Sequence, residues 1–218
     1  MVERAVAEER MLTLTTYAYF ADERDYIDAI LNDFLVAAGR PSLEGQLSYC
    51  IHELANNAKK ANTKRVYFHE KGLDLYEESD YWMGMRGFRE ETVRDIDYYL
   101  KRLREHGLYI KIQFKLNREH MLIAVRNNVR LTPIERAKME QKIRESKRYD
   151  NMADAYASIE DSSEGAGLGM VMMIIMLRNL GFNEKIIRFF ASEHETRVLL
   201  TIPVADDEAS RYSSSISN

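Results

Sequence analysis

Apolar side chains recur every three or four positions over several long stretches of the chain, a period typical of amphipathic helices. Residues 22–38 follow this period, and Gly39 is placed to end the helix. The same reasoning predicts four further helices, over 42–62, 93–106, 133–146 and 170–180. The helix at 133–146 opens on a Thr132–Glu135 capping box with proline in its first turn.

Strict alternation of apolar and polar residues predicts strands instead. It predicts one hairpin from 109–116 and 121–127 and a second from 185–191 and 197–204, with a short strand at 65–68. Residues 1–20 give a weak helical or extended signal, and 70–90 have an irregular pattern. We therefore predict an α/β fold, a two-layer sandwich. Its mixed sheet has about five strands covered by helices on one face, plus an N-terminal helix and an inserted helix.

Composition narrows the functional classes. The 218 residues carry 31 Lys and Arg against 35 Asp and Glu, a net charge of −4, so a broadly basic nucleic-acid surface is excluded. The single cysteine, Cys50, excludes an internal disulfide and is expected to pack in the core. The longest apolar run, 170–177, is too short for a membrane span, and the charged N-terminus is unlike a signal peptide. We expect a cytoplasmic protein that binds neither nucleic acid nor membrane.

The predicted helix at 42–62 separates its polar residues into two groups. Glu53, Asn57 and Lys60 fall on one edge of the apolar face, at spacings of four and seven. An amide oxygen suits a hard cation, an ammonium suits a phosphate, and a carboxylate can hold a water or a proton. The alternative is a solvated helix edge that binds nothing.

His52 falls on the far side of the same helix wheel, where we expect a surface histidine. The remaining histidines have no spacing along the sequence that is typical of metal ligands, so metal binding by histidine is not expected.

A glycine-rich loop leads directly into the apolar helix at 170–180. Gly165, Gly167 and Gly169, with Leu168 between the last two, allow a ligand to approach the backbone closely. The first turn of the following helix offers free N–H groups, which favour an anion such as phosphate. The loop has neither the preceding strand of a dinucleotide fold nor the Gly-Lys-Ser/Thr ending of a P-loop. A flexible hinge is the alternative interpretation.

Taken in order, three segments resemble the motifs of the histidine-kinase-like ATPase superfamily (GHKL, Bergerat fold). Residues 53–61 resemble its N box, 123–128 the strand and turn of its first glycine box, and 165–169 its second glycine box. The resemblance covers about 42–204. It implies ATP bound with Mg²⁺ in a left-handed α/β sandwich beneath a mobile lid.

The resemblance also implies roles for individual residues. Asn57 would coordinate the Mg²⁺ that bridges the phosphates, Lys60 would contact phosphate, and Glu53 would take the place of the general base. The segment from Gly165 through Gly167 and Leu168 to Gly169 would bind the phosphates. Asn127 would contact the base.

The chain departs from the family pattern in three ways. Asn127 stands where the family has aspartate and Val129 where it has glycine, so selectivity between ATP and GTP is open. The N box and the first glycine box are unusually far apart, which suggests an insertion at 70–107 that either binds a partner protein or packs on its own domain. Residues 1–51 contain no histidine, so phosphorylation of an upstream histidine is not expected.

The resulting division is an N-terminal helical extension at 1–40, an ATP-binding domain at 41–204 and a disordered tail at 205–218. The insertion lies at 70–107 and the lid at 128–164. We expect an ATP-binding signalling protein that transfers phosphate to a partner protein or hydrolyses ATP. The alternatives are a non-catalytic nucleotide-gated module that binds a partner, and a dimeric scaffold in which helix 22–38 pairs with a second copy.

Overall fold

The computed structural model describes residues 1–159 and 168–205. Its sheet contains β1 (Leu12–Thr16), β2 (Ile110–Leu116), β3 (His120–Asn127), β4 (Ile187–Ala191) and β5 (Thr196–Pro203). The strand order is β1-β2-β3-β5-β4, and each neighbouring pair is antiparallel. The predicted α/β class and two-layer sandwich are confirmed, and the described sheet is antiparallel throughout rather than mixed. Both predicted hairpins are present.

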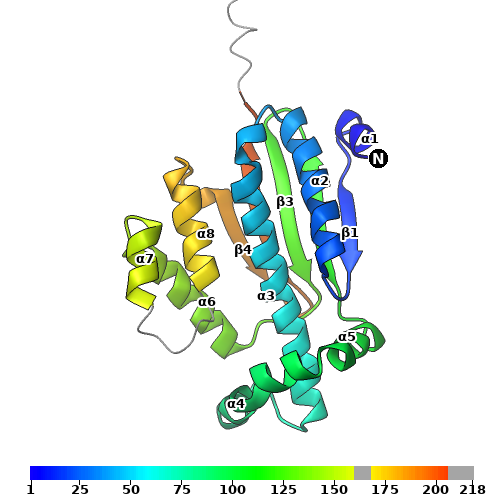
Figure 1. Cartoon of the computed structure of the whole chain (residues 1–218), viewed down its shortest axis with the longest axis vertical. Coiled ribbons are helices and arrows are strands. Elements are labelled where there is room, and N and C mark those ends of the chain that lie inside the picture. The colour runs from blue at the N-terminus through cyan, green and yellow to red at the C-terminus, as the bar shows by residue number, and fades with distance from the viewer. Residues whose placement is uncertain (160–167, 206–218) are drawn as a thin grey trace, which may run out of the picture.

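Helices cover one face of this sheet, with α2, α3 and α8 side by side in front of the strands (Figure 1). The described helices are α1 (Val2–Ala7), α2 (Ala21–Ala37), α3 (Glu44–Glu70), α4 (Glu78–Arg94), α5 (Ile96–Glu105), α6 (Pro133–Ser146), α7 (Met152–Ile159) and α8 (Leu168–Asn179). Short 3₁₀ turns lie at Pro41–Leu43 and Glu184–Ile186. Within the described residues, we find no helix with both the length and the apolar character needed to cross a bilayer.

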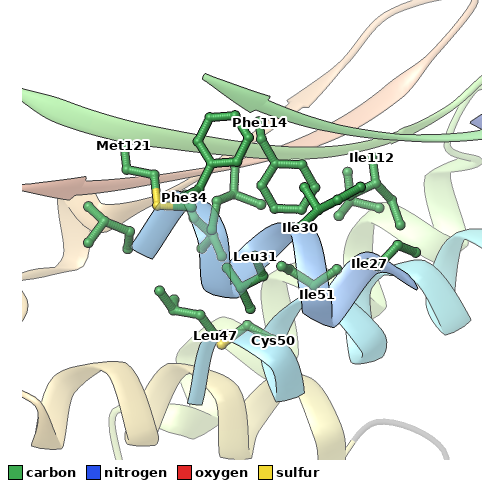
Figure 2. Close-up of a cluster of buried hydrophobic side chains, with 14 of the residues drawn as sticks. Ile27, Ile30, Leu31, Phe34, Leu47, Cys50, Ile51, Ile112, Phe114 and Met121 are labelled. Carbon is green, nitrogen blue, oxygen red and sulfur yellow. The ribbon is translucent and has the colours of Figure 1, made fainter. Parts of the chain in front are cut away.

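The main core lies between the sheet and the helices α2 and α3. Phe34 of α2 stacks on Phe114 of β2 with ring centroids 5.5 Å apart (Figure 2). The apolar face of α2, which we considered for pairing with a second copy, packs in this core. Cys50 of α3 is fully buried there, as predicted, and burial raises the pKa of its thiol to about 12.

Two local predictions are wrong. Residues 65–68, predicted as a strand, continue α3 to Glu70, and much of the irregular 70–90 segment is the helix α4. At Gly84 of α4, a Cβ would lie 2.6 Å from the Phe68 ring. This glycine allows two helices to approach closely and does not interrupt α4.

Residues 70–107, which we call the arm, extend beyond the sheet. Figure 1 shows α4 and α5 lying across the far end of α3. They pack on Val66, Tyr67 and Phe68 of α3 in a second apolar cluster, separate from the main core. Because Tyr67 and Phe68 contact residues of the arm, the apolar run that resembled a strand is instead the base on which the arm packs.

Candidate functional site

The structure brings two of the predicted site residues into direct contact on one edge of α3. Asn57 Nδ2 donates a hydrogen bond of 2.9 Å to Glu53 Oε1. Glu53 is partly buried, whereas Asn57 and Lys60 are exposed. The spacing of four residues therefore places the carboxylate and the amide as the helix wheel predicted. Lys60 follows one turn later on the same edge.

The first turn of α8 approaches this same edge. Gly169 is the second residue of α8, and a Cβ added there would overlap the Glu53 carboxyl group. A larger residue there would require the flexible Glu53 carboxyl group to move, so glycine permits the observed approach of Glu53 to α8. Two segments separated by more than a hundred residues in the sequence meet at one carboxylate. Leu168 begins α8, whereas Gly165 and Gly167 lie outside the described residues.

The charges at this contact determine which ligand could bind at the junction of α3 and α8. The N-terminus of a helix carries partial positive charge, which is complementary to the Glu53 carboxylate. An anion bound at the same turn would face Glu53 and be repelled by it. A phosphate can approach only if a cation lies between the two groups or if Glu53 rotates away. The neighbouring Asn57 offers an oxygen ligand suitable for a hard cation.

Asn127 occupies a different position, beneath α3 at the end of β3. It is 4% exposed, and its Nδ2 donates to Asn62 Oδ1 at 2.9 Å. Asn62 in turn donates to the Tyr109 carbonyl at 3.1 Å. Because Nδ2 is engaged, Oδ1 is the Asn127 atom suited to accept a proton from a base amino group. The buried Val129 side chain adds bulk where the resembled family has glycine.

Asn62 follows Asn57 by five residues, which corresponds to about 8 Å along the axis of α3. The base-contact candidate is thus displaced from the Glu53 and Asn57 pair along the helix. The displacement is in the direction of the arm, because α3 runs from the sheet towards its end at Glu70.

The segment predicted as a lid is attached to α3 by a buried ion cluster. Glu135 of α6 contacts Lys64 Nζ at 2.7 Å and Arg65 Nη2 at 2.5 Å, and its side chain is 9% exposed. Burial opposes ionisation, but hydrogen bonds from Arg65 and the charges of Lys64 and Arg65 outweigh it. Together they lower the pKa of Glu135 to about 2. Burial lowers the pKa of Lys64, and the charge of Glu135 opposes that shift.

Glu135 also completes the predicted capping box. Its backbone N–H donates to Thr132 Oγ1, and its carboxylate accepts from the Thr132 N–H, both at 3.1 Å. The sequence therefore identified Glu135 as a cap but missed its ion pairs with α3. Lys64, close to the apolar run at 66–68, was the available signal of such a pair. A lysine that is buried with its apolar neighbours requires a counter-charge.

The other end of α6 is attached to α8. Arg178 donates to the carbonyl of Ser146 at 3.2 Å and to the carbonyl of Tyr149. Residues 152–159, within the segment predicted as a lid, form the helix α7, and Ala155 packs against Val171 of α8. The described part of the lid is therefore packed on both α3 and α8.

The prediction that His52 is a solvated surface residue is wrong. Its Nε2 lies 2.9 Å from Asp28 Oδ2 of α2, and its Nδ1 bonds the hydroxyl of Tyr19. Ser48 donates to the other Asp28 oxygen at 2.7 Å. The helix wheel could not reveal these partners, because they come from α2 and the turn before it. These contacts join α3 to α2 on the edge away from Glu53.

One curated relative is similar to nearly the whole chain. It is an uncharacterized protein of Treponema pallidum (strain Nichols), 39% identical over 202 residues. The match covers 93% of this chain and 39% of that protein, so the chain spans about two fifths of its relative's length. No protein-family model matches the chain, and no solved structure matches it.

Proposed function

We propose that the chain binds ATP with Mg²⁺ at the junction of α3 and α8 and directs the terminal phosphate to a partner protein or to water. The observation that carries this proposal is the contact between Glu53 and Gly169. The polar edge of α3 and the glycine-rich segment that leads into α8 each suggested nucleotide chemistry, and they meet at this contact. The cytoplasm, where ATP and Mg²⁺ are available, is the location that fits this activity.

The residues at the junction are suited to a nucleotide bound with a metal. The backbone N–H groups of the first turn of α8 would bind phosphate oxygens. Asn57 would supply an oxygen ligand to Mg²⁺, whose charge would offset the repulsion between the phosphates and the Glu53 carboxylate. Lys60, on the same edge, would add positive charge near the phosphates. Asn127 would accept the amino proton of adenine through Oδ1.

Glu53 would act on the nucleophile. A carboxylate beside the transferred phosphate can accept the proton of an attacking water or hydroxyl and orient it for attack. Asn57 donates to Oε1, which orients the carboxylate, and Oε2 would then face the nucleophile. The remaining catalysis would come from positioning and from neutralising the phosphate charge.

A specific observation favours a second candidate, a nucleotide-gated module that binds a partner without chemistry. Lys138 of α6 lies 4.7 Å from the Trp82 ring and 5.2 Å from the Tyr81 ring, both on the arm. Movement of the lid on nucleotide binding would break these contacts and alter the exposure of Trp82, already 45% exposed. The arm would then present or hide a surface for a protein partner.

An equilibrium titration with Mg-ATP tests nucleotide binding. We expect saturable binding that is lost in Asn57→Ala and retained in Asn56→Ala, a matched change at the next residue of α3. Asn56 accepts a hydrogen bond from Arg24 on the α2 side, so its loss leaves the α8 edge intact. Equal binding by both variants, or none by the native chain, would refute the proposed site.

A measurement of ATP turnover distinguishes the enzyme from the non-catalytic nucleotide-gated module. Glu53→Gln keeps the shape of the side chain and its ability to accept from Asn57, but it removes the base. If the protein is an enzyme, this variant binds Mg-ATP and loses phosphate release or transfer by roughly 10²-fold or more. If the native chain binds Mg-ATP without turnover, the module is the better account. Glu44→Gln, an exposed change in the first turn of α3, serves as the control.

A further inference from the structure

Two histidines and a carboxylate meet at the end of α3, away from the proposed nucleotide site. His69 and Glu70 are the last residues of α3, and His106 follows α5 directly. One ligand atom from each residue lies within 4.8 Å of the other two. The imidazole rings of His69 and His106 are 5.3 Å apart and meet edge to face at 70°. All three residues are exposed.

We propose that His69, Glu70 and His106 form a binding site for a divalent transition metal of the Zn²⁺ class, which ties the end of α3 to the end of α5. Two imidazoles and one carboxylate form a ligand set used by zinc sites that keep a fourth position open. The ligands come from two helices that are far apart in the sequence, which is why their spacing along the chain gave no signal.

The geometry requires only a small adjustment. Zinc bonds of about 2.0–2.1 Å in a tetrahedral site place neighbouring ligand atoms roughly 3.4 Å apart. The present separations are at most 4.8 Å, so the side chains must close by no more than about 1.4 Å. Exposed histidine side chains can make this adjustment by rotation without moving the helices.

Among the contacts described for Glu70, Oε1 accepts two hydrogen bonds and Oε2 accepts one. Arg102 donates to Oε1 from Nε at 2.7 Å and from Nη2 at 2.5 Å, whereas Oε2 accepts a single bond from Tyr98 at 3.0 Å. These donors, from Arg102 and Tyr98, hold the carboxylate in place beside the two imidazoles.

The surrounding charges also favour a cation. His69 and His106 lie at the C-terminal ends of α3 and α5, where helix dipoles carry partial negative charge. The positive charge of Arg102 opposes a metal, but Arg102 also pairs with Glu105 at 2.6 Å. Gly107 has φ of +63° and ends α5 directly after His106, which fixes where that imidazole begins.

The test is a titration of the full chain, prepared without a histidine tag and freed of metal by a chelator, with Zn²⁺ alone. We expect one equivalent to bind, and Co²⁺ to give the visible absorption of a tetrahedral site. His69→Ala and His106→Ala should each weaken Zn²⁺ binding at least tenfold, because each removes one of three ligands. Glu70→Gln should weaken it as well.

Two matched controls remove exposed or partly exposed histidines elsewhere. His194→Ala and His120→Ala should leave Zn²⁺ binding unchanged, although both lie beside a glutamate. Circular dichroism confirms that each variant folds. The proposal is overturned if no saturable binding occurs, if binding survives His69→Ala and His106→Ala, or if a control variant abolishes it. These outcomes are independent of Mg-ATP binding at Glu53.

Discussion

The ion cluster between α6 and α3 gives a stability prediction whose size follows from the structure. The pKa of Glu135 falls from its ordinary value of 4.5 to about 2 in the folded chain. Each pKa unit corresponds to about 1.4 kcal/mol, so the ionised carboxylate contributes about 3 kcal/mol at neutral pH. Breaking a buried ion pair by removing one partner costs about 3–5 kcal/mol, a similar value. We therefore expect Glu135→Gln to lower the free energy of unfolding by about 3 kcal/mol.

The stabilisation that Glu135 provides should decrease as the pH falls. A carboxylate whose pKa is lower in the folded state stabilises the fold above its unfolded pKa, and this contribution is lost as pH falls towards its folded pKa. The difference between the native chain and Glu135→Gln should therefore be constant at neutral pH and shrink between about pH 4.5 and pH 2. By pH 3 about 2 kcal/mol of it should be gone.

Urea unfolding at several pH values measures this difference. Glu145→Gln is the matched control, since Glu145 lies on the same helix and pairs with Lys142 near the surface at 2.9 Å. Its loss should cost less than about 1 kcal/mol. The reasoning is refuted if Glu135→Gln is no more destabilising than the control at neutral pH, or if the difference does not diminish in acid.

Three further predictions follow from single contacts. Gly169→Ala should displace the flexible Glu53 carboxylate and reduce ATP turnover, while changing the free energy of unfolding by less than about 1 kcal/mol. Full turnover by this variant would contradict the proposed site. Phe34→Ala should cost about 3–5 kcal/mol in urea unfolding, because Phe34 is fully buried against Phe114; a loss under about 1 kcal/mol would contradict this packing. Cys50 should react with a thiol reagent only on unfolding, since burial raises its pKa to about 12; rapid labelling of the native chain would contradict it.

The sequence predicted those elements that depend on local periodicity. The hairpins, the capped helix at Pro133–Ser146 and the apolar helix after the glycine loop are all present. It failed where tertiary contacts decide the structure. The run Val66–Phe68 suits a strand or a buried helix equally by its residues, and the arm packing on it selects the helix. The irregular pattern of residues 70–90 gave no sign that Gly84 allows α4 to pack closely on the Phe68 ring.

In the candidate site, too, contacts within one helix were predictable from the sequence and contacts between helices were not. Glu53 and Asn57 meet because spacings of four residues are local to a helix. The approach of Gly169 to Glu53 was suggested only by the resemblance to a family, and the structure provides the contact. The partners of His52 and Glu135, and the cluster at His69, each join separate helices. Periodicity along one helix carries no information about such contacts.

Hydrogen–deuterium exchange with and without Mg-ATP tests the central claim most directly, because it locates the bound nucleotide on the chain. The account predicts slower exchange in the first turn of α8, from Leu168, and along the Glu53–Lys60 edge of α3. The same protection should be absent in Asn57→Ala. If exchange is unchanged at both segments while Mg-ATP is bound, or if protection is confined to the arm, the nucleotide does not bind at the junction of α3 and α8.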